Sequence, residues 1–496
     1  MTRMSSSGTE RFDSLSKDRK KLLQLLREGK KRDSSRIRSF SRVDSNGSSV
    51  RIPTSWSQQR LWFVDQLEDG RAGYQILVPM RLHGVLQLTP LQKALDTVVE
   101  RHEMLRTGFV RVAGELTQVI FPTGRFSLKV FDLRGSEELE REAKVRAHKL
   151  EEMDGRFDLA LCPLIRGRLL QVKDEEYVLL IAFHHIIADG WSKSLFIREV
   201  AELYRAYSEG RENPLAPLPI QYADYVLWHR EAWERSPRLT EQLSYWCERL
   251  EGLVPQLELP TDRPRPAVQT YRGETISVVL DEQLTAKLRA FAQRNELTLF
   301  MFLYAGWCVL LARLSGQEDI AVGTPTANRQ RPELDRLIGL FVNVLVLRVE
   351  VRPDLRVKEF LAQVKKVTLG AYDHQHAPFE QVVASVRPQR SMSRSALFQV
   401  MFVLHNELRT ELDLPGLTAT IEEDVDEPAI LDLWVSLEER GDRIAGSVNY
   451  AADLFDRSTV KRWMECYSVL LRGMTEGVSD RIENLPILPE TNATRY

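Results

Sequence analysis

Residues 177–192 read Tyr-Val-Leu-Leu-Ile-Ala-Phe-His-His-Ile-Ile-Ala-Asp-Gly-Trp-Ser. The run from Tyr177 to Phe183 is apolar and rich in branched side chains, which is typical of a β-strand buried on both faces. After Gly190 the apolar residues recur with a helical period, from Leu195 to Tyr207. The stretch therefore predicts a strand, a turn with two histidines and a helix. α/β sheets commonly place their chemistry at such strand ends.

The two histidines of this turn, His184 and His185, are expected to differ in their surroundings. Adjacent residues of a strand point to opposite sides, so the pair should not share one ligand or one proton. One would face a cavity and the other the packing. Asp189 is too close along the chain to be assumed a catalytic partner, and it could equally hold the loop through an arginine elsewhere. Gly190 gives the loop backbone freedom and leaves room for a ligand near its N–H.

Several kinds of site are disfavoured by the residues around the histidines. A zinc site needs three or four converging ligands, and two adjacent histidines without a nearby cysteine or H-x-x-x-H spacing do not provide them, so no metal is expected. The sequence has no G-x-S-x-G nucleophile elbow and no Walker-type phosphate loop. What remains is a histidine that acts on an incoming nucleophile, as a base or as a hydrogen-bonding orienter. The alternative is a buried histidine pair without chemistry.

The composition is that of an ordinary globular protein. The chain has 496 residues, with 43% hydrophobic and 28% charged residues and a formal net charge of −2. Nothing in this balance calls for nucleic acid or an anionic membrane. No apolar run reaches the roughly 18 residues of a membrane helix, and the polar N-terminus does not resemble a secretory signal. The four cysteines are far apart and are interpreted as reduced core thiols. We therefore expect a cytoplasmic protein.

The chain divides into segments of different character. Residues 1–50 are polar, serine-rich and basic around a short leucine-containing stretch, which predicts either a surface helix or a docking segment for a partner protein. Strands and helices alternate over 51–225 and again over 273–486, while 226–272 contain a helix and a proline-rich connection. Residues 487–496 would begin a linker to a following domain. The fold class is thus mixed α/β, with two comparable lobes.

Three local patterns in the first lobe make specific predictions. Thr89 and Pro90 are expected to be the N-cap and first residue of a helix. The strand Gln75–Leu82 contains Pro79, which argues for an edge strand or a bulge. The strand Leu164–Val172 is expected to pair with the Tyr177 strand through a tight turn.

The stretch His184–Gly190 resembles the HHxxxDG signature of condensation domains of nonribosomal peptide synthetases, a signature that epimerisation domains share. Six other stretches resemble the remaining core motifs of condensation domains, and all seven occur in order within about residues 51–486. The six stretches are Ser55–Trp62, Arg101–Phe109, Tyr222–Trp228, Ile338–Asn343, His376–Glu380 and Arg390–Arg394. The last has Ser391 where the family usually has Asp.

The resemblance implies a fold and a reaction. The fold would be two chloramphenicol-acetyltransferase-like lobes in a V-shaped pseudo-dimer, with the histidine motif at the junction and a central tunnel. Donor and acceptor peptidyl carrier proteins would present 4'-phosphopantetheine thioesters from opposite faces, and the acceptor amine would attack the donor acyl thioester. The chain itself would bind no cofactor and act as a monomer. Leu485–Pro489 resembles the linker to an adenylation domain, which would be a neighbouring partner.

The same resemblance implies roles for the motif residues. His185 would be the catalytic base or the orienter of the amine, and His184 a packed member of the motif. Asp189 would hold the loop by an ion pair. The backbone N–H of Gly190 could donate to the developing oxyanion.

Further roles fall on residues outside the signature. Arg329 is the expected ion-pair partner of Asp189, with Arg60 and Arg106 as rivals. Trp191 and Asn343 are expected to line the substrate channel.

Several branches of the family can be weighed. The heterocyclising branch has Asp-x-x-x-x-Asp in place of the two histidines and is excluded, and the extra His-His motif of the dual epimerising branch is absent. The motifs most resemble the branch that joins an L-configured donor to an L acceptor. A starter branch that N-acylates an amino acid, and a branch that modifies the acceptor, stay open. The alternatives of a different class are a non-catalytic platform that binds carriers or tailoring enzymes, and an epimerase.

Overall fold

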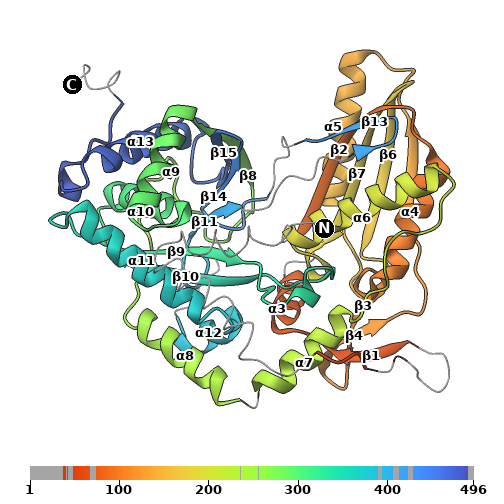
Figure 1. Cartoon of the computed structure of the whole chain (residues 1–496), viewed down its shortest axis with the longest axis horizontal. Helices are drawn as coiled ribbons and strands as arrows, with labels where there is room; N and C mark the ends of the chain where they lie inside the picture. The colour runs from red at the N-terminus through yellow and green to blue at the C-terminus, as the bar shows by residue number, and fades with distance from the viewer. Residues whose placement is uncertain are drawn as a thin grey trace, which may run out of the picture.

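The computed structural model describes residues 37–40, 42, 49–67, 74–234, 236–254, 256–388, 394–405, 413–422 and 428–489. The predictions for residues 1–36 and for most of the seventh motif, 390–393, lie outside the described residues. The chain forms two α/β lobes side by side, as predicted, with α7 (Tyr222–Glu234) and α8 (Pro237–Leu250) running beneath them (Figure 1).

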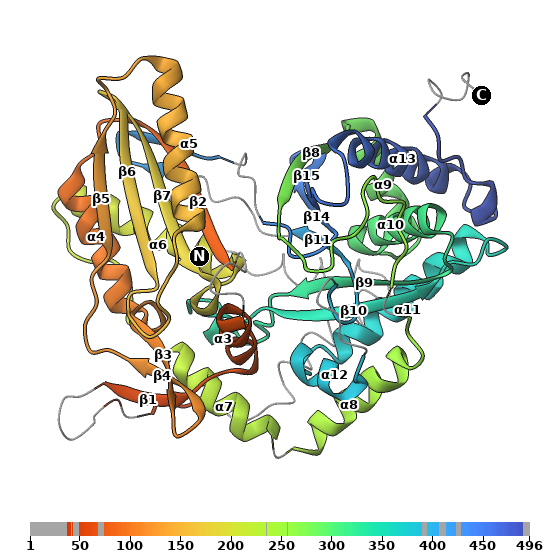
Figure 2. The same ribbon diagram turned by 180° about the vertical axis from the view of Figure 1, so that it is seen from behind.

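The N-terminal lobe is built on a six-stranded sheet in the order β12-β13-β2-β7-β6-β5. Helices α4 and α6 cover one face of the sheet, and α5 covers the other (Figure 2). The bounds are β2 (Gln75–Gly84), α4 (Leu88–Arg101), β5 (Ser127–Asp132), α5 (Glu138–Asp154), β6 (Ile165–Lys173), β7 (Glu176–His184) and α6 (Gly190–Ser208).

The predicted burial of the Tyr177 strand on both faces is confirmed, because β7 lies in the middle of this sheet. Val178 and Leu180 pack with Val145 of α5, whereas Leu179 and Ile181 belong to the core beneath α4 and α6. The pairing of β6 with β7 through a tight turn is also confirmed. A continuous apolar run therefore serves two cores at once.

A smaller sheet and two short elements complete this lobe. The sheet has the order β1-β4-β3. The bounds are β1 (Val50–Pro53), α3 (Trp56–Leu67), the 3₁₀ turn η1 (Glu103–Arg106), β3 (Thr107–Val112) and β4 (Glu115–Ile120). Helix α3 lies between the two lobes (Figures 1 and 2).

The C-terminal lobe has a six-stranded sheet in the order β10-β9-β11-β14-β15-β8. Helix α10 is almost wholly buried in the core of this lobe. Among the described residues no single helix has the length and apolarity to cross a membrane, although the bent pair α9 and α10 would pass together. The bounds are β8 (Gly273–Leu280), α9 (Glu282–Arg294), α10 (Leu299–Ser315), β9 (Asp319–Thr326), β10 (Asn343–Glu350), α11 (Val357–Asp373), α12 (Phe379–Val386), β11 (Val400–His405), β14 (Leu433–Arg440), β15 (Arg443–Ala451) and α13 (Arg457–Glu476).

Two predictions of element boundaries are wrong. The division at residue 225 falls inside α7, which runs unbroken from Tyr222 to Glu234 before Ser236 caps α8. Helix α4 begins at Leu88 rather than at Pro90. Its N-cap is Gln87, which makes no side-chain cap bond and whose N–H donates to Tyr204 Oη at 3.0 Å. Pro90 still fits, since the first helical N–H groups need no partner within the helix.

A hairpin from the C-terminal half crosses into the N-terminal sheet. Its strands are β12 (Asp413–Leu414) and β13 (Leu417–Ile421), and β13 pairs antiparallel with β2. The prediction that 273–486 form one lobe is therefore wrong for this hairpin, which fills the open edge of β2. The Cα register ends at Ile421 opposite Met80, and the Glu422 N–H donates to the Pro79 carbonyl at 2.9 Å, so Pro79 lies at the end of this pairing.

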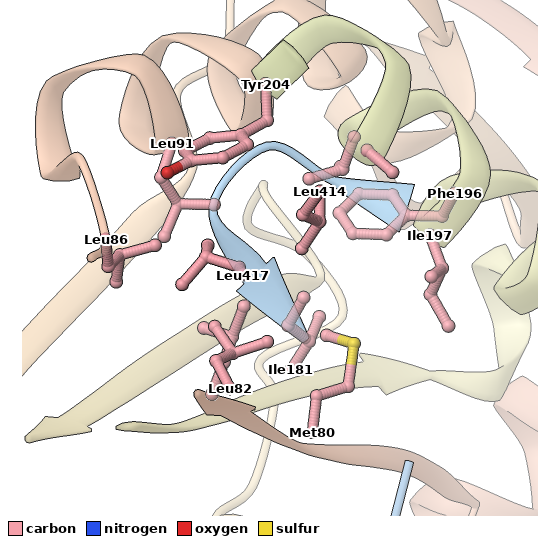
Figure 3. A pocket seen from close by; sticks show the side chains of 13 residues that line it. Met80, Leu82, Leu86, Leu91, Ile181, Phe196, Ile197, Tyr204, Leu414 and Leu417 are labelled. Carbon is pink, nitrogen blue, oxygen red and sulfur yellow. The ribbon is translucent and has the colours of Figure 1, made fainter. Parts of the chain in front are cut away.

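The crossing hairpin also closes an apolar cavity of about 30 Å³ in the N-terminal lobe. Figure 3 shows Leu414 and Leu417 of the hairpin above Met80 and Leu82 of β2, with Phe196 of α6 at the side. The hairpin is thus held by apolar contacts as well as by strand pairing.

A second crossing segment joins β9 to β10, and we name residues 327–342 the bridging segment. Its apolar side chains are buried in the core of the N-terminal lobe, although both flanking strands belong to the C-terminal lobe. The buried members are Leu334, Leu337, Ile338, Leu340 and Phe341. The bridging segment therefore brings C-terminal backbone to the histidine turn.

Candidate active site at the lobe junction

The two histidines lie where β7 ends. His184 is the last residue of β7, His185 opens the 3₁₀ turn η2 (His185–Ile187), and α6 begins at Gly190. The His185 N–H still donates to the Tyr74 carbonyl at 2.8 Å. The strand thus delivers both rings to the junction of the lobes in a fixed backbone frame.

His184 is buried, with 3% of its surface exposed. Its Nδ1 accepts a hydrogen bond from the Ile186 N–H at 3.1 Å, so the ring hydrogen of the neutral form is on Nε2. That Nε2 lies 3.6 Å from Asp65 Oδ1, and Phe157 meets the ring edge-on. The structure places His184 in the packing of the lobe junction.

His185 has the opposite arrangement. Its Nδ1 lies 2.7 Å from the Ala188 carbonyl oxygen, which can only accept, so Nδ1 carries the hydrogen. Burial lowers the pKa of His185, which favours the neutral ring. A neutral ring with hydrogen on Nδ1 has its lone pair on Nε2. The geometry therefore leaves Nε2 as an acceptor for an incoming N–H.

The buried carboxylate of Asp189 forms hydrogen bonds both within the start of α6 and to the bridging segment. As N-cap of α6, its Oδ1 accepts from the Ser192 N–H at 2.8 Å. Its Oδ2 accepts from the backbone N–H groups of Phe341 at 2.9 Å and Val342 at 3.2 Å. With 2% exposure, the carboxylate has its oxygens occupied by structural bonds. This arrangement ties the histidine turn to the bridging segment.

Of the three arginines considered for Asp189, the structure places Arg329 beside it, with Nη2 at 3.4 Å from Oδ1. The two rivals contact other acids: Arg60 lies 3.7 Å from Glu380, and Arg106 lies 3.7 Å from Glu103. Arg329 also donates to the carbonyl oxygens of Leu334 and Leu337.

The remaining predicted residues lie around the turn. An added Cβ at Gly190 would meet no atom within 4 Å, and its φ is not in the left-handed region, so the position opens space rather than needing glycine flexibility. The Trp191 indole N–H donates to the Asp335 carbonyl at 2.9 Å. Asn343 holds the 375–379 loop, donating to Gln375 and Ala377 and accepting from the Phe379 N–H. Asn343 also lines a pocket between the lobes.

Three more residues hydrogen-bond to the backbone of the bridging segment, and the sequence did not predict them as site residues. Ser192 Oγ accepts from the Gly339 N–H at 3.1 Å, and the Tyr222 hydroxyl donates to the Leu340 carbonyl at 2.8 Å. His102 Nδ1 accepts from the Ile338 N–H at 3.4 Å. Tyr222 and His102 belong to the stretches that resemble the fourth and second core motifs, so these motifs could have identified them as site residues.

Residues 49–495 match the family model described as Condensation domain. The chain belongs to the condensation domain family. The chain is also 44% identical to a linear gramicidin synthase polypeptide of Brevibacillus parabrevis over 443 residues, which are 88% of this chain and 9% of that protein. This condensation domain therefore spans less than a tenth of that relative.

Solved structures show the same fold. In the complex of the X-domain and OxyB from teicoplanin biosynthesis, the matching chain has a TM-score of 0.80 at 28% identity, covering 92% of this chain and 99% of that one. The condensation domain of the monacolin K polyketide synthase MokA has a TM-score of 0.76 at 20% identity, covering 88% and 100%. The predicted two-lobed, chloramphenicol-acetyltransferase-like fold of condensation domains is confirmed.

Proposed function

We propose that this condensation domain forms peptide bonds in a nonribosomal peptide synthetase. The acceptor aminoacyl amine attacks the donor acyl or peptidyl thioester, and both substrates are carried on 4'-phosphopantetheine arms of carrier proteins. The observation that carries the proposal is the hydrogen bond from His185 Nδ1 to the Ala188 carbonyl, which leaves the Nε2 lone pair for the amine.

This geometry supports the following reaction. The amine nitrogen forms a bond to the thioester carbon and the C–S bond breaks. As a base, His185 Nε2 accepts the proton lost by nitrogen and returns it to the departing thiolate; as an orienter, it only holds the amine, and the proton passes from nitrogen to the thiolate directly. Because a thioester is already activated, positioning of the amine supplies much of the rate. The Gly190 N–H, at the first turn of α6 and next to open space, can donate to the oxyanion.

The partners follow from the substrates. A donor and an acceptor carrier protein would deliver their arms to the His185 turn through a central tunnel, with Trp191 and Asn343 along the channel, and an adenylation domain would supply the acceptor. The chain would need no cofactor of its own and would act as a cytoplasmic monomer. The L-to-L branch remains our prediction for its stereochemistry.

The test is a reconstituted assay with separately loaded donor and acceptor carriers, read by intact mass of the acceptor. His185→Ala is expected to lower the rate by about 10²–10⁴-fold. His185→Gln separates the two roles, because its amide oxygen accepts a hydrogen bond but takes up no proton. His83→Ala, at an exposed histidine of β2, is the matched control. Equal rates for wild type and His185→Ala would overturn the proposal.

The pH dependence of the same assay has a defined sign. A base must be neutral, so activity is lost as the pH falls through the pKa of His185. Since burial lowers that pKa, the midpoint is expected below the value of an ordinary histidine. A midpoint above it would contradict the assignment of His185 as the base.

A second candidate function is a non-catalytic platform. It is favoured by the likeness to the X-domain, whose solved structure is a complex with OxyB. In the same assay, carrier binding without amide formation for any acyl pair would support the platform.

A further inference from the structure

Asp65 belongs to α3, and this helix packs against the histidine turn in the space between the lobes (Figure 2). Its Oδ1 is 3.6 Å from His184 Nε2, with 13% of the Asp65 side chain and 4% of the His184 side chain exposed. This distance is longer than a hydrogen bond, so the carboxylate acts on the ring through its charge. Such a charge is weakly screened in a nearly buried site.

The charge of Asp65 and the backbone of the turn favour the same form of His184. The Ile186 N–H needs the lone pair of Nδ1, which places the ring hydrogen on Nε2, toward Asp65. The other tautomer would direct the Nδ1 hydrogen at the Ile186 N–H and the Nε2 lone pair at the carboxylate, and both contacts would be repulsive. Asp65 therefore opposes that tautomer.

Two further described side chains next to His184, Phe157 and Gln75, are uncharged. Phe157 meets the ring at 6.2 Å with an interplanar angle of 84°. Gln75, which faces His184 in the β2–β7 ladder, gives its Nε2–H to the Gly155 carbonyl at 2.7 Å.

The tautomer of His184 matters for its neighbour. The bond from Ile186 to His184 Nδ1 is the N-cap of η2, and the same turn contains the bond from His185 Nδ1 to Ala188. We infer that Asp65 is a positioning residue, which acts through His184 to hold the turn that presents His185 Nε2 to the acceptor amine. The catalytic consequence rests on the proposed function, whereas the tautomer does not.

The experiment uses the full chain labelled with ¹⁵N-histidine. Imidazole ¹⁵N shifts, assigned with His184→Gln, are expected to show hydrogen on Nε2 of His184 in the wild type. Asp65→Asn keeps the shape but removes the charge, and is expected to populate the Nδ1–H form and to lower the turnover rate roughly fivefold, with little change in KM. Asp65→Glu is expected to restore the tautomer and the rate. Asp174→Asn, the same change at an exposed carboxylate, is the control.

Each result has one meaning. An unchanged His184 tautomer in Asp65→Asn, or hydrogen on Nδ1 in the wild type, overturns the inference without touching the proposed function. A tautomer shift with an unchanged rate overturns the positioning role. If the wild type forms no amide but the tautomer shifts as described, the proposed function fails and the electrostatic part of the inference stands.

Discussion

Several side chains at the lobe junction are held by hydrogen bonds to backbone groups. His184 and His185 are neighbours, yet their Nδ1 atoms play opposite roles because one meets an N–H and the other a carbonyl. Asp189 likewise accepts two backbone N–H bonds from the bridging segment. The chemistry of this turn is therefore set by which backbone group stands opposite each side chain.

The Asp189–Arg329 pair gives a prediction at this scale. Both side chains are almost fully buried, at 3% and 2% exposure. Arg329→Ala leaves a buried carboxylate without its counter-charge and is expected to lower the free energy of unfolding by about 3–5 kcal/mol, measured by urea denaturation. Arg134→Ala removes an arginine from exposed pairs with Asp132 and Asp174 and is expected to change the free energy of unfolding little. Equal losses would show that burial of the Arg329 pair is unimportant.

The resemblance to the family pointed to Arg329 as the partner of Asp189 but left Arg60 and Arg106 as rivals. Arg60 and Arg106 stood within core motifs, and only the fold shows that they meet Glu380 and Glu103 while Arg329 lies beside Asp189. The tautomers of the histidines were beyond sequence reasoning for the same reason. They depend on turn geometry across three residues, which no residue pattern encodes.

The sequence predicted where helices and strands lie better than it predicted which elements pack or pair with them. The apolar run of β7 signalled burial on both faces because each face meets a core. Strand β13 has an equally ordinary pattern, but it pairs with β2 rather than with strands of its own half. An apolar pattern predicts that a strand has a buried face, but it does not predict which sheet the strand joins.

A substitution at Gly84 tests how the crossing hairpin β12–β13 packs against β2. Its φ is +123°, and an added Cβ would lie 2.0 Å from the Gly416 carbonyl oxygen in the hairpin. Gly84→Ala is expected to displace β12–β13 and to speed hydrogen exchange there, with a loss of about 2–5 kcal/mol.

The matched control is Gly114→Ala, which also has a positive φ of +89° but nothing within 4 Å of an added Cβ. It should show only the backbone strain, about 1–2 kcal/mol, and normal exchange in the hairpin. Similar exchange in the two variants would mean that the close approach at Gly84 does not matter.

At the scale of the whole molecule, a carboxylate after β13 fastens the two lobes. Glu422 accepts from Arg81 Nε at 2.7 Å and from Lys149, and both cations belong to the N-terminal lobe. Burial raises the pKa of Glu422, but the hydrogen bonds from Lys149 and Arg81 outweigh it and the pKa is lowered. The stabilisation is therefore present above the pKa of the unfolded chain and is lost as the pH falls through the folded value.

Glu422→Gln removes this charge. It is expected to lower the free energy of unfolding by about 1–3 kcal/mol at neutral pH and to flatten the acid dependence of stability. Urea denaturation across the acid range measures both. Glu142→Gln, at an exposed carboxylate that also faces Arg81, should have little effect. An unchanged acid dependence in Glu422→Gln would show that this carboxylate adds nothing to the strand pairing and apolar contacts that hold the hairpin.

The crossing hairpin also has a consequence for biosynthesis. Arg81 of β2 and its partner Glu422 are 341 residues apart, so β2 leaves the ribosome long before the strand that covers it. Until then the N-terminal sheet has an open edge, which neighbouring nascent chains on a polysome could extend. Pro79 lacks a backbone N–H, and its carbonyl later accepts from the Glu422 N–H, so this edge is short of one donor until β13 is made. Pro79 predicted an edge strand, and β2 is an edge strand only until β13 has been synthesised.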